Sequence, residues 1–292
     1  MEKPTVLGVD IGGSHVTAAI VDLDKGVLVK NSIKRNAVDS RTNKEEILAA
    51  WCEVINAAFG KNNVGEKSIG IAMPGPFDYE KGVSLIKDQD KFDSLYMVNV
   101  REELAKKLAI KPSCIRLIND AAAFMQGEVF SGAAKGYQSV LGLTLGTGLG
   151  SAISVNGVSQ DAALWNSEFK AGIAEDYLST RWFIKKYKQL TGTTVEGVKE
   201  LSSIAQTDHN AMKVFEEFGV NLSKFLEPII NGHGSEIVIL GGNIAQAFPL
   251  FSNILQQKLP KTNIKITELN EHASLIGAAS CWAKKVNEVA DH

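Results

Sequence analysis

Cysteine is scarce in this sequence, and long apolar runs are missing. None of the three cysteines in the 292 residues belongs to a CxxC pair, so the sequence favours neither a disulfide framework nor a cysteine-built zinc site. We expect the thiols to be buried and reduced. No stretch of 18 apolar residues is free of charges, and we therefore expect no membrane-spanning segment.

The sequence also lacks an excess of basic charge. Its net charge is −2, which argues against nucleic acid or an anionic membrane surface as a partner. The first ten residues, MEKPTVLGVD, enter an apolar strand without the charged start and long apolar run of a signal peptide. We therefore expect a cytoplasmic protein. Its composition is that of a globular chain, and its length suggests about two domains.

One pattern occurs twice. VLGVDIGGSH at 6–15 returns as VLGLTLGTGLG at 140–150, with Asp10 in the first copy where the second has Thr144. Each copy is followed by more strand-like sequence, so a strand, a glycine loop and a second strand form a hairpin. This predicts an internal duplication of a hairpin-led α/β domain. The alternative is that two buried strands with glycine turns resemble each other by chance.

Between and after the two copies, strands alternate with helical patterns. Asn43 and Gly60 have the residue types of a helix N-cap and a C-terminal stop. We expect further strands at SIGIAMPGPFD, CIRLIND and EIVILGGN, and the prolines of the first end its ladder. The predicted helices are residues 43–60, VNVREELAKKLAI, DAAAFMQGEVFSGAA, and roughly 175–190, 208–232, 244–259 and HASLIGAASCWAKKV.

The glycine loops are candidate phosphate sites. Glycine lets successive backbone amides approach an anion, and the hydroxyls of Ser14 and Thr147 add donors. Neither GxxxxGK[ST] nor a full GxGxxG before a helix is present. A plain hairpin turn is the alternative for each loop. Asp10 favours a site, because a carboxylate inside an apolar strand needs compensation, which Mg²⁺ carried by a nucleotide would supply. An Asp that only accepts bonds from loop amides is the alternative.

Five segments together resemble the ROK group (repressors, open reading frames and kinases) of the sugar-kinase and actin-like superfamily. They are VDIGGS at 9–14, MPGP at 73–76, LINDAAA at 117–123, LTLGTGLGSA at 143–152 and VILGGNI at 238–244. They follow the family's order and spacing over nearly the whole chain. The resemblance implies an α/β fold of duplicated ribonuclease-H-like domains, with sugar and nucleotide bound in a cleft between them.

The resemblance also assigns roles to residues. It implies that Asp120 is the catalytic base and that Asn119 hydrogen-bonds the sugar. Asp120 would sit past a strand's carboxyl end and at a helix N-terminus, where a carboxylate stays ionised and can accept a hydroxyl proton. The alternative is that Asn119 and Asp120 only cap a helix. The remaining implied contacts are Gly75 and Pro76 beside the sugar; Asp10, Gly12, Gly13, Ser14, Gly146, Thr147 and Gly148 at the phosphates; and Gly241 and Gly242 near the adenosine.

Residues 163–181, ALWNSEFKAGIAEDYLSTR, depart from the family's pattern. Glu168 and Glu175 match its two sugar-binding glutamates, although a loop carboxylate and a first-turn acid are the alternatives. The family's histidine position falls near Ala171, its zinc cysteines are missing, and Lys170 is a candidate substitute for the histidine. The pattern is closest to the zinc-free polyphosphate and ATP glucokinases. Arg181 and the lysines that follow it either line a polyphosphate groove or form a solvated helix face.

These observations predict a hexose kinase that uses Mg²⁺ and ATP, most simply a glucokinase acting on the 6-hydroxyl. A polyphosphate-dependent glucokinase and a catalytically weak sugar-binding protein are alternatives. A repressor is disfavoured, since the phosphate strand starts at residue 5 and leaves no room for a helix-turn-helix. We expect domains at 1–118 and 119–272, a terminal helix at about 273–292 that packs back on the first, and a possible homodimer, which is the family's habit.

Overall fold

The computed structural model describes residues 5–60 and 67–283. Contacts divide the chain into two compact units, one formed by the residues up to Gly132 with those from Glu271 onward, and the other by Ala133–Asn270. The helix after Asp120 therefore belongs to the first unit, whereas the sequence placed it in the second domain. The expected terminal helix extends into residues 284–292, which lie outside the described part.

The first unit is built on a mixed sheet with strand order β3-β2-β1-β5-β8, and β4 also pairs with β2. β1 is antiparallel to β2 and parallel to β5, which is in turn parallel to β8. The strands of the first unit are β1 (Thr5–Ile11), β2 (His15–Asp22), β3 (Val27–Leu28), β4 (Lys34–Ala37), β5 (Lys67–Met73), β6 (Phe77–Asp78), β7 (Val83–Ser84) and β8 (Ile115–Asn119). Its helices are α1 (Lys44–Phe59), η1 (Asp93–Leu95), α2 (Val100–Leu108), η2 (Pro112–Cys114), α3 (Asp120–Ser131) and α9 (Ala273–Ser280).

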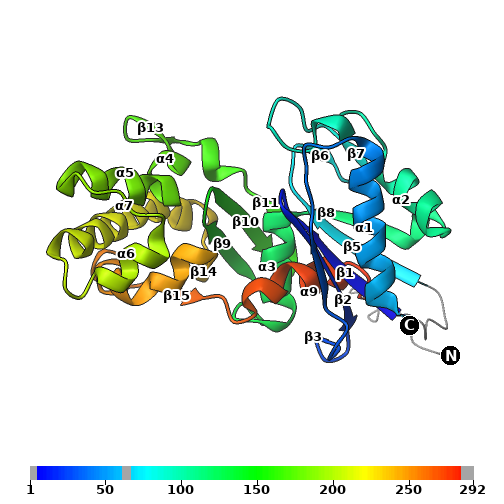
Figure 1. The fold of residues 1–292 in the computed structure, drawn as a ribbon. Coiled ribbons are helices and arrows are strands. Elements are labelled where there is room, and N and C mark those ends of the chain that lie inside the picture. The colour runs from blue at the N-terminus through cyan, green and yellow to red at the C-terminus, as the bar shows by residue number, and fades with distance from the viewer. Residues whose placement is uncertain (1–4, 61–66, 284–292) are drawn as a thin grey trace, which may run out of the picture. The chain divides into compact units, whose positions relative to one another are not determined.

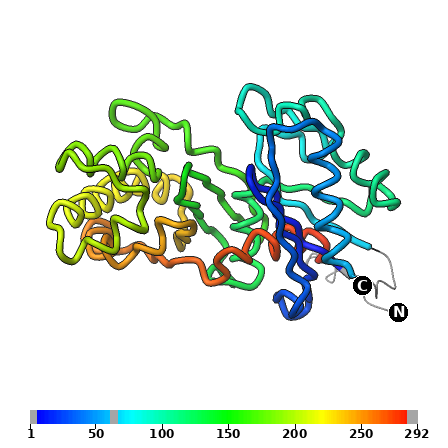
Figure 2. The backbone as a smooth tube through the Cα atoms, viewed as in Figure 1, coloured from blue at the N-terminus to red at the C-terminus, as the bar shows by residue number. Residues whose placement is uncertain are grey.

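Different helices cover the two faces of this sheet (Figure 1). One face packs against α1 and α2 in a core that contains Trp51 together with Leu7, Val9 and Ile11 of β1. α9 and α3 pack on the other face, where Ala72, Ala123 and Ala278 form a small cluster. Figure 2 shows the red α9 segment running back beside the blue strands.

The approach of α9 is close because glycines stand where it meets the sheet. A Cβ added to Gly8 would lie 2.0 Å from the carbonyl oxygen of Leu275, and one on Gly70 would lie 1.9 Å from that of Ala278. The glycines of the sheet thus let α9 (Ala273–Ser280) lie close against β1 and β5.

The second unit repeats the arrangement with strand order β11-β10-β9-β14-β15. As in the first unit, a leading antiparallel hairpin, here β9 with β10, is followed by strands parallel to its first member. Its strands are β9 (Ser139–Leu145), β10 (Leu149–Val155), β11 (Val158–Asp161), β12 (Glu168–Phe169), β13 (Gly172–Ile173), β14 (Ile237–Gly241) and β15 (Asn263–Ile266). Its helices are η3 (Leu164–Asn166), α4 (Ala174–Leu178), α5 (Thr180–Thr191), α6 (Val198–Ile204), α7 (His209–His233), η4 (Asn243–Leu250) and α8 (Ser252–Lys258), and η5 (Asn270–His272) leads out of the unit.

The matching strand orders confirm the predicted duplicated α/β fold. Local expectations also hold at α1, where the side chain of Asn43 accepts from Glu46 N–H and Gly60 ends the helix with φ 68°. Two predicted helices are interrupted. The one at 175–190 breaks at Ser179 between α4 and α5, and the one at 244–259 divides into η4 and α8, with Pro249 near the break.

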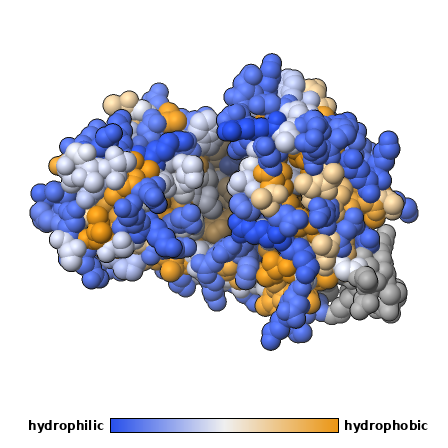
Figure 3. Space-filling model, in the orientation of Figure 1, coloured by the Kyte–Doolittle hydropathy of each residue, from blue (hydrophilic) through white to orange (hydrophobic). Residues whose placement is uncertain are grey.

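The visible face is mostly polar, with scattered apolar areas (Figure 3). In the part of the chain that the structure describes, no helix is both long enough and apolar enough to span a membrane. Cys52 and Cys114 are buried as expected, and Cys281 is half-buried.

Candidate active site

The first unit gathers its predicted site residues at one edge of its sheet. The carboxyl ends of the parallel strands β1, β5 and β8 lead into Gly12–Gly13–Ser14, Pro74–Gly75–Pro76 and Asn119–Asp120 respectively. Ligands bind at this edge in α/β folds. Segments more than a hundred residues apart in the sequence thereby reach the same place.

The first glycine loop is a tight turn between β1 and β2. Gly12 N–H donates to the carbonyl of His15 at 2.9 Å, and the Ser14 carbonyl accepts from Val38 N–H at 2.9 Å. The Ser14 hydroxyl lies 2.9 Å from Nδ1 of His15. Gly12, Gly13 and Ser14 are all exposed, so this loop offers backbone and hydroxyl groups to a ligand.

Asp10 lies on the sheet face covered by α9 and α3. Asp10 is paired in register with Thr17 of β2, and Thr17 is paired in turn with Arg35 of β4. Burial and, to a smaller extent, the negative charge of Asp120 raise the pKa of Asp10 to about 6, and Arg35 opposes the rise. The two carboxylates therefore interact electrostatically, although 110 positions separate them in the sequence.

Asn119 and Asp120 have different roles at the start of α3. The side-chain oxygen of Asn119 accepts from Ala122 N–H at 3.1 Å, so Asn119 is the helix cap. Asp120 is exposed, and its Oδ1 accepts from the adjacent Ala121 N–H at 2.8 Å. The capping alternative thus describes Asn119, and the Asp120 carboxylate is left at the helix N-terminus, where the helix dipole favours its ionised form.

Tyr79 joins the proline loop to Asn119, and the sequence analysis missed it. Asn119 Nδ2 donates to the Tyr79 hydroxyl at 3.3 Å, and that hydroxyl donates to the carbonyl of Met73 at 3.0 Å. The ring packs on Phe77 with centroids 5.0 Å apart. The Gly75–Pro76 peptide is cis. The only signal for Tyr79 in the sequence is its position just after MPGP.

The second unit brings its two glycine segments together in the same way. β9 ends in Gly146–Thr147–Gly148 and β14 ends at Gly241, which is in register with Thr144. Gly242 has φ 82°, and a Cβ there would lie 2.4 Å from the carbonyl oxygen of Leu145. Glycine is therefore required at 242 for the end of β14 to lie against the start of the second loop.

The second glycine loop is held from α4 and α5. Both the backbone N–H and the hydroxyl of Thr180 donate to the Gly146 carbonyl, at 2.8 Å and 2.9 Å. Oε2 of Glu175 accepts from Leu149 N–H at 3.0 Å, and its Oε1 pairs with Arg181 at 2.5 Å. Both carboxylate oxygens of Glu175 thus have partners inside the second unit, and its predicted contact with sugar stays a prediction.

Glu168 and Lys170 lie on the short β12–β13 hairpin. Glu168 is exposed and pairs in register with Ile173. Lys170 donates instead to Oδ1 of the buried Asn221 on α7, and burial lowers its pKa. Its ammonium also lies over the ring of Tyr177. Lys170 therefore contacts α7, and its role as a substitute for the histidine stays a prediction.

Two of the four basic residues of α5 form ion pairs, and its apolar side is buried at Trp182 and Phe183. Arg181 pairs with Glu175, and Lys186 with Glu217 at 2.6 Å. Within the described residues no group of three or more His, Cys, Asp or Glu side chains is arranged to hold a metal ion.

The sequence of this chain matches a known protein family and several curated relatives. The ROK family model matches residues 6–161 and 170–285. The chain is 26% identical to a glucokinase of Thermotoga maritima, over 98% of this chain and 99% of that protein. It is 24% identical to an N-acetyl-D-glucosamine kinase of Pectobacterium atrosepticum, over 90% and 91%.

Solved structures share the fold at low sequence identity. A ROK hexokinase from Thermus thermophilus aligns with TM-score 0.76 and 22% identity, over 94% of this chain and 96% of its own. A ROK glucokinase from Streptomyces griseus, solved with glucose and AMPPNP, gives 0.75 and 22%, over 95% and 98%. A polyphosphate/ATP-glucomannokinase from an Arthrobacter species gives 0.70 and 24%, over 95% and 97%.

The family model leaves out residues 162–169, which include Glu168 and belong to the stretch where the sequence departs from the family's pattern. It matches most of the chain on both sides of that gap. This chain belongs to the ROK family.

Proposed function

We propose that this protein is a hexose kinase that transfers the γ-phosphoryl group of ATP to the 6-hydroxyl of its sugar, most simply glucose. The observation that carries the proposal is the exposed carboxylate of Asp120, at the same sheet edge as the glycine loop at 12–14. A base beside an anion-binding loop is what phosphoryl transfer to an alcohol requires. Relatives named as a glucokinase and an N-acetyl-D-glucosamine kinase support a hexose acceptor.

In this mechanism Asp120 accepts the proton of the sugar hydroxyl while the oxygen attacks the γ-phosphorus. The bond from that phosphorus to the bridging oxygen breaks, and ADP leaves with the electron pair. Asn119 sets the position of Asp120 by capping α3, and its amide nitrogen is tied to Tyr79. Catalysis here is positioning and charge stabilisation, as is general for this chemistry.

The residues present fit a magnesium ion carried by the nucleotide. Mg²⁺ keeps several waters and is bound through one or two carboxylates together with substrate phosphates, so it needs no cage of protein ligands. Asp10, partly buried and with a raised pKa beside Asp120, is where a cation would compensate negative charge. Asp10 would hold the ion through water, and the ion would neutralise charge on the phosphates.

The remaining residues have assigned places in this proposal. Gly75, Pro76 and Asn119 would contact the sugar, joined by Glu168 and Glu175. The loops Gly12–Ser14 and Gly146–Gly148 would bind phosphate, and Gly241–Gly242 would lie near the adenosine. The support is that the glycine segments of each unit end neighbouring strands.

A matrix of donors and sugars tests the proposal. Purified protein with Mg-ATP should release ADP in a sugar-dependent manner with at least one member of a panel that contains glucose, mannose, fructose and N-acetylated hexoses. Asp120→Asn should lower kcat by at least about a hundredfold, the size of a typical general-base contribution. No turnover with any sugar, or a fully active Asp120→Asn variant, would contradict the proposal. Light scattering on the same sample tests the proposed homodimer.

Two alternatives can be separated by the same samples. Polyphosphate in place of ATP tests a polyphosphate glucokinase, which the fold shared with the Arthrobacter enzyme supports. The ion pairs of Arg181 and Lys186 argue against a free basic groove on α5. Calorimetry that detects sugar binding without turnover would instead indicate a catalytically weak binding protein.

A further inference from the structure

Lys91 lies against the first glycine loop, although it belongs to a different part of the sequence. A Cβ built on Gly13 would lie 3.7 Å from Cδ of Lys91, so the lysine stem packs over the place where Gly13 has no side chain. Lys91 is half-buried, and it takes part in none of the ion pairs found among the described residues.

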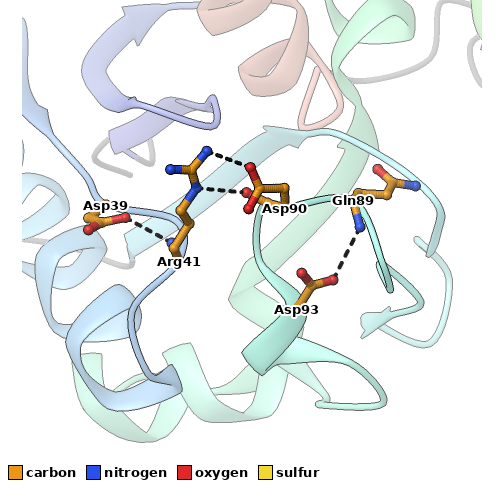
Figure 4. A network of polar contacts seen from close by, with 5 residues as sticks. All are labelled: Asp39, Arg41, Gln89, Asp90 and Asp93. Atoms are coloured by element: carbon orange, nitrogen blue, oxygen red, sulfur yellow. Dashed lines mark hydrogen bonds and ion pairs between the residues drawn. The ribbon is translucent and has the colours of Figure 1, made fainter.

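The backbone is fixed on the N-terminal side of Lys91. Arg41 pairs with Oδ2 of Asp90 at 2.5 Å, and its Nε donates to the Asp90 carbonyl at 3.3 Å (Figure 4). Arg41 is itself held, because its N–H donates to Oδ1 of Asp39 at 3.0 Å. Asp90 thus has both its side chain and its carbonyl bound to one guanidinium.

The backbone is fixed on the C-terminal side as well. Phe92 is fully buried against Trp51 with ring centroids 5.5 Å apart, and its N–H donates to the Ser40 carbonyl at 2.7 Å. Phe92 has φ 58°, a left-handed conformation that is costly for a bulky residue and persists only where the surroundings determine it. The Lys91 backbone is therefore set between two anchored residues, and its side-chain stem lies against Gly13.

We propose that Lys91 binds the terminal phosphate of the phosphoryl donor at the Gly12–Ser14 loop. This inference rests on the proposed function to the extent that a phosphate chain occupies that loop. The backbone of the exposed Gly13 and Ser14 forms the anion-binding part, because Gly12 N–H already donates to the His15 carbonyl, and a lysine adds a point charge with three donors. The terminal phosphate of ATP and that of polyphosphate share this chemistry, so both belong in the test.

The test compares Lys91→Met with Lys87→Met. Methionine keeps the apolar stem over Gly13 and removes the charge. Lys87 is an exposed lysine on the same segment that lies over the Tyr96 ring, which makes it a matched control for the loss of one positive charge. We expect Lys91→Met to raise KM for Mg-ATP at least about tenfold, the loss of one charge-assisted contact, with the sugar KM within twofold of wild type. Polyphosphate as donor should show the same ratio if it is used, and Lys87→Met should match wild type.

Binding of tripolyphosphate gives a readout that needs no turnover. Calorimetry should show binding weakened at least about tenfold in Lys91→Met and unchanged in Lys87→Met. If the wild type phosphorylates no sugar but this difference appears, the inference stands and the proposed function fails. If turnover occurs and Lys91→Met matches wild type in donor KM and tripolyphosphate binding, the inference alone is overturned. A change confined to the sugar KM, or a wild type that binds neither tripolyphosphate nor Mg-ATP, also overturns it.

A double-mutant cycle separates contact from general damage to the loop. Arg41→Met should weaken tripolyphosphate binding in the wild-type background, because it frees Asp90 and with it Lys91. The same substitution should have little effect once Lys91 is methionine, since the group being positioned is gone. Equal effects in both backgrounds would contradict the positioning role of Arg41. Lys91→Arg should recover part of the lost affinity.

Discussion

Replacing Asp10 by asparagine should stabilise this protein at neutral pH. Burial, together with the charge of Asp120, moves the pKa of Asp10 from 3.8 to about 6, against the pull of Arg35. The folded state thus holds the Asp10 proton more tightly than the unfolded state does. As pH rises between these two pKa values, the unfolded chain loses the Asp10 proton before the folded protein does. The contribution of Asp10 to the free energy of unfolding therefore falls through this window and is constant above it.

The size of the effect follows from the shift. About two pKa units at 1.36 kcal/mol each give about 3 kcal/mol at pH 7, and the same linkage leaves only about 1 kcal/mol at pH 4.5. Asparagine cannot ionise and avoids this cost. The gain in unfolding free energy of Asp10→Asn over wild type should therefore grow from about 1 to about 3 kcal/mol across that range.

Urea unfolding of both proteins from pH 4.5 to pH 7.5, in buffer with chelator and without nucleotide, measures this gain. Asp208→Asn is a control of opposite sign. The Tyr187 hydroxyl, with help from the N–H groups of Ala211 and Asn210, holds the pKa of Asp208 below its usual value, so asparagine there should give no gain at pH 7. A gain for Asp10→Asn that is flat with pH, or a loss at pH 7, would refute the reasoning.

Two further substitutions test the loops. Tyr79→Phe removes the hydroxyl that joins Asn119 to the Met73 carbonyl. We expect urea unfolding to show a free energy of unfolding lower by about 1 kcal/mol, and kinetics to show a several-fold lower kcat with an unchanged donor KM. An unchanged kcat would contradict a role for Tyr79 in placing Asn119. Gly148→Ala puts a Cβ 2.6 Å from Oε2 of Glu175, so it should break that oxygen's bond to Leu149 and cost about 1–2 kcal/mol. Gly146→Ala, where the added Cβ meets open space, is the stability control, and equal losses in the two variants would count against this explanation.

Much of the fold could be predicted from local sequence. The glycine-punctuated repeat predicts the two leading hairpins, and Asn43 with Gly60 predicts the ends of α1, because caps and turns depend on residues a few positions apart. The break at Ser179 could not be predicted in this way, since α5 starts where Thr180 bonds to the second glycine loop. That contact joins segments far apart in the chain.

The same limit applies to the candidate site. Asp10, Asn119 and Asp120 could be proposed from the sequence because each lies in a motif directly after, or near the end of, an apolar strand. Tyr79 and Lys91 lie on loops with no such motif, and the roles proposed for them rest on their contacts with Asn119 and Gly13. Glu175 matches the family's pattern and its contact with sugar stays a prediction, whereas its bonds to Leu149 and Arg181 depend on packing that no local pattern encodes.

The duplicated sheets differ in charge at one matched position. In the first unit Asp10 stands in a row with Thr17 and Arg35. In the second unit the equivalent Thr144 stands between Gly150 and Gly241. A neutral hydroxyl between glycines carries no ionisation cost, whereas a carboxylate in the charged row does. The pH-dependent gain predicted for Asp10→Asn should therefore have no counterpart at Thr144, and Thr144→Val should leave the slope of stability against pH between 4.5 and 7.5 unchanged.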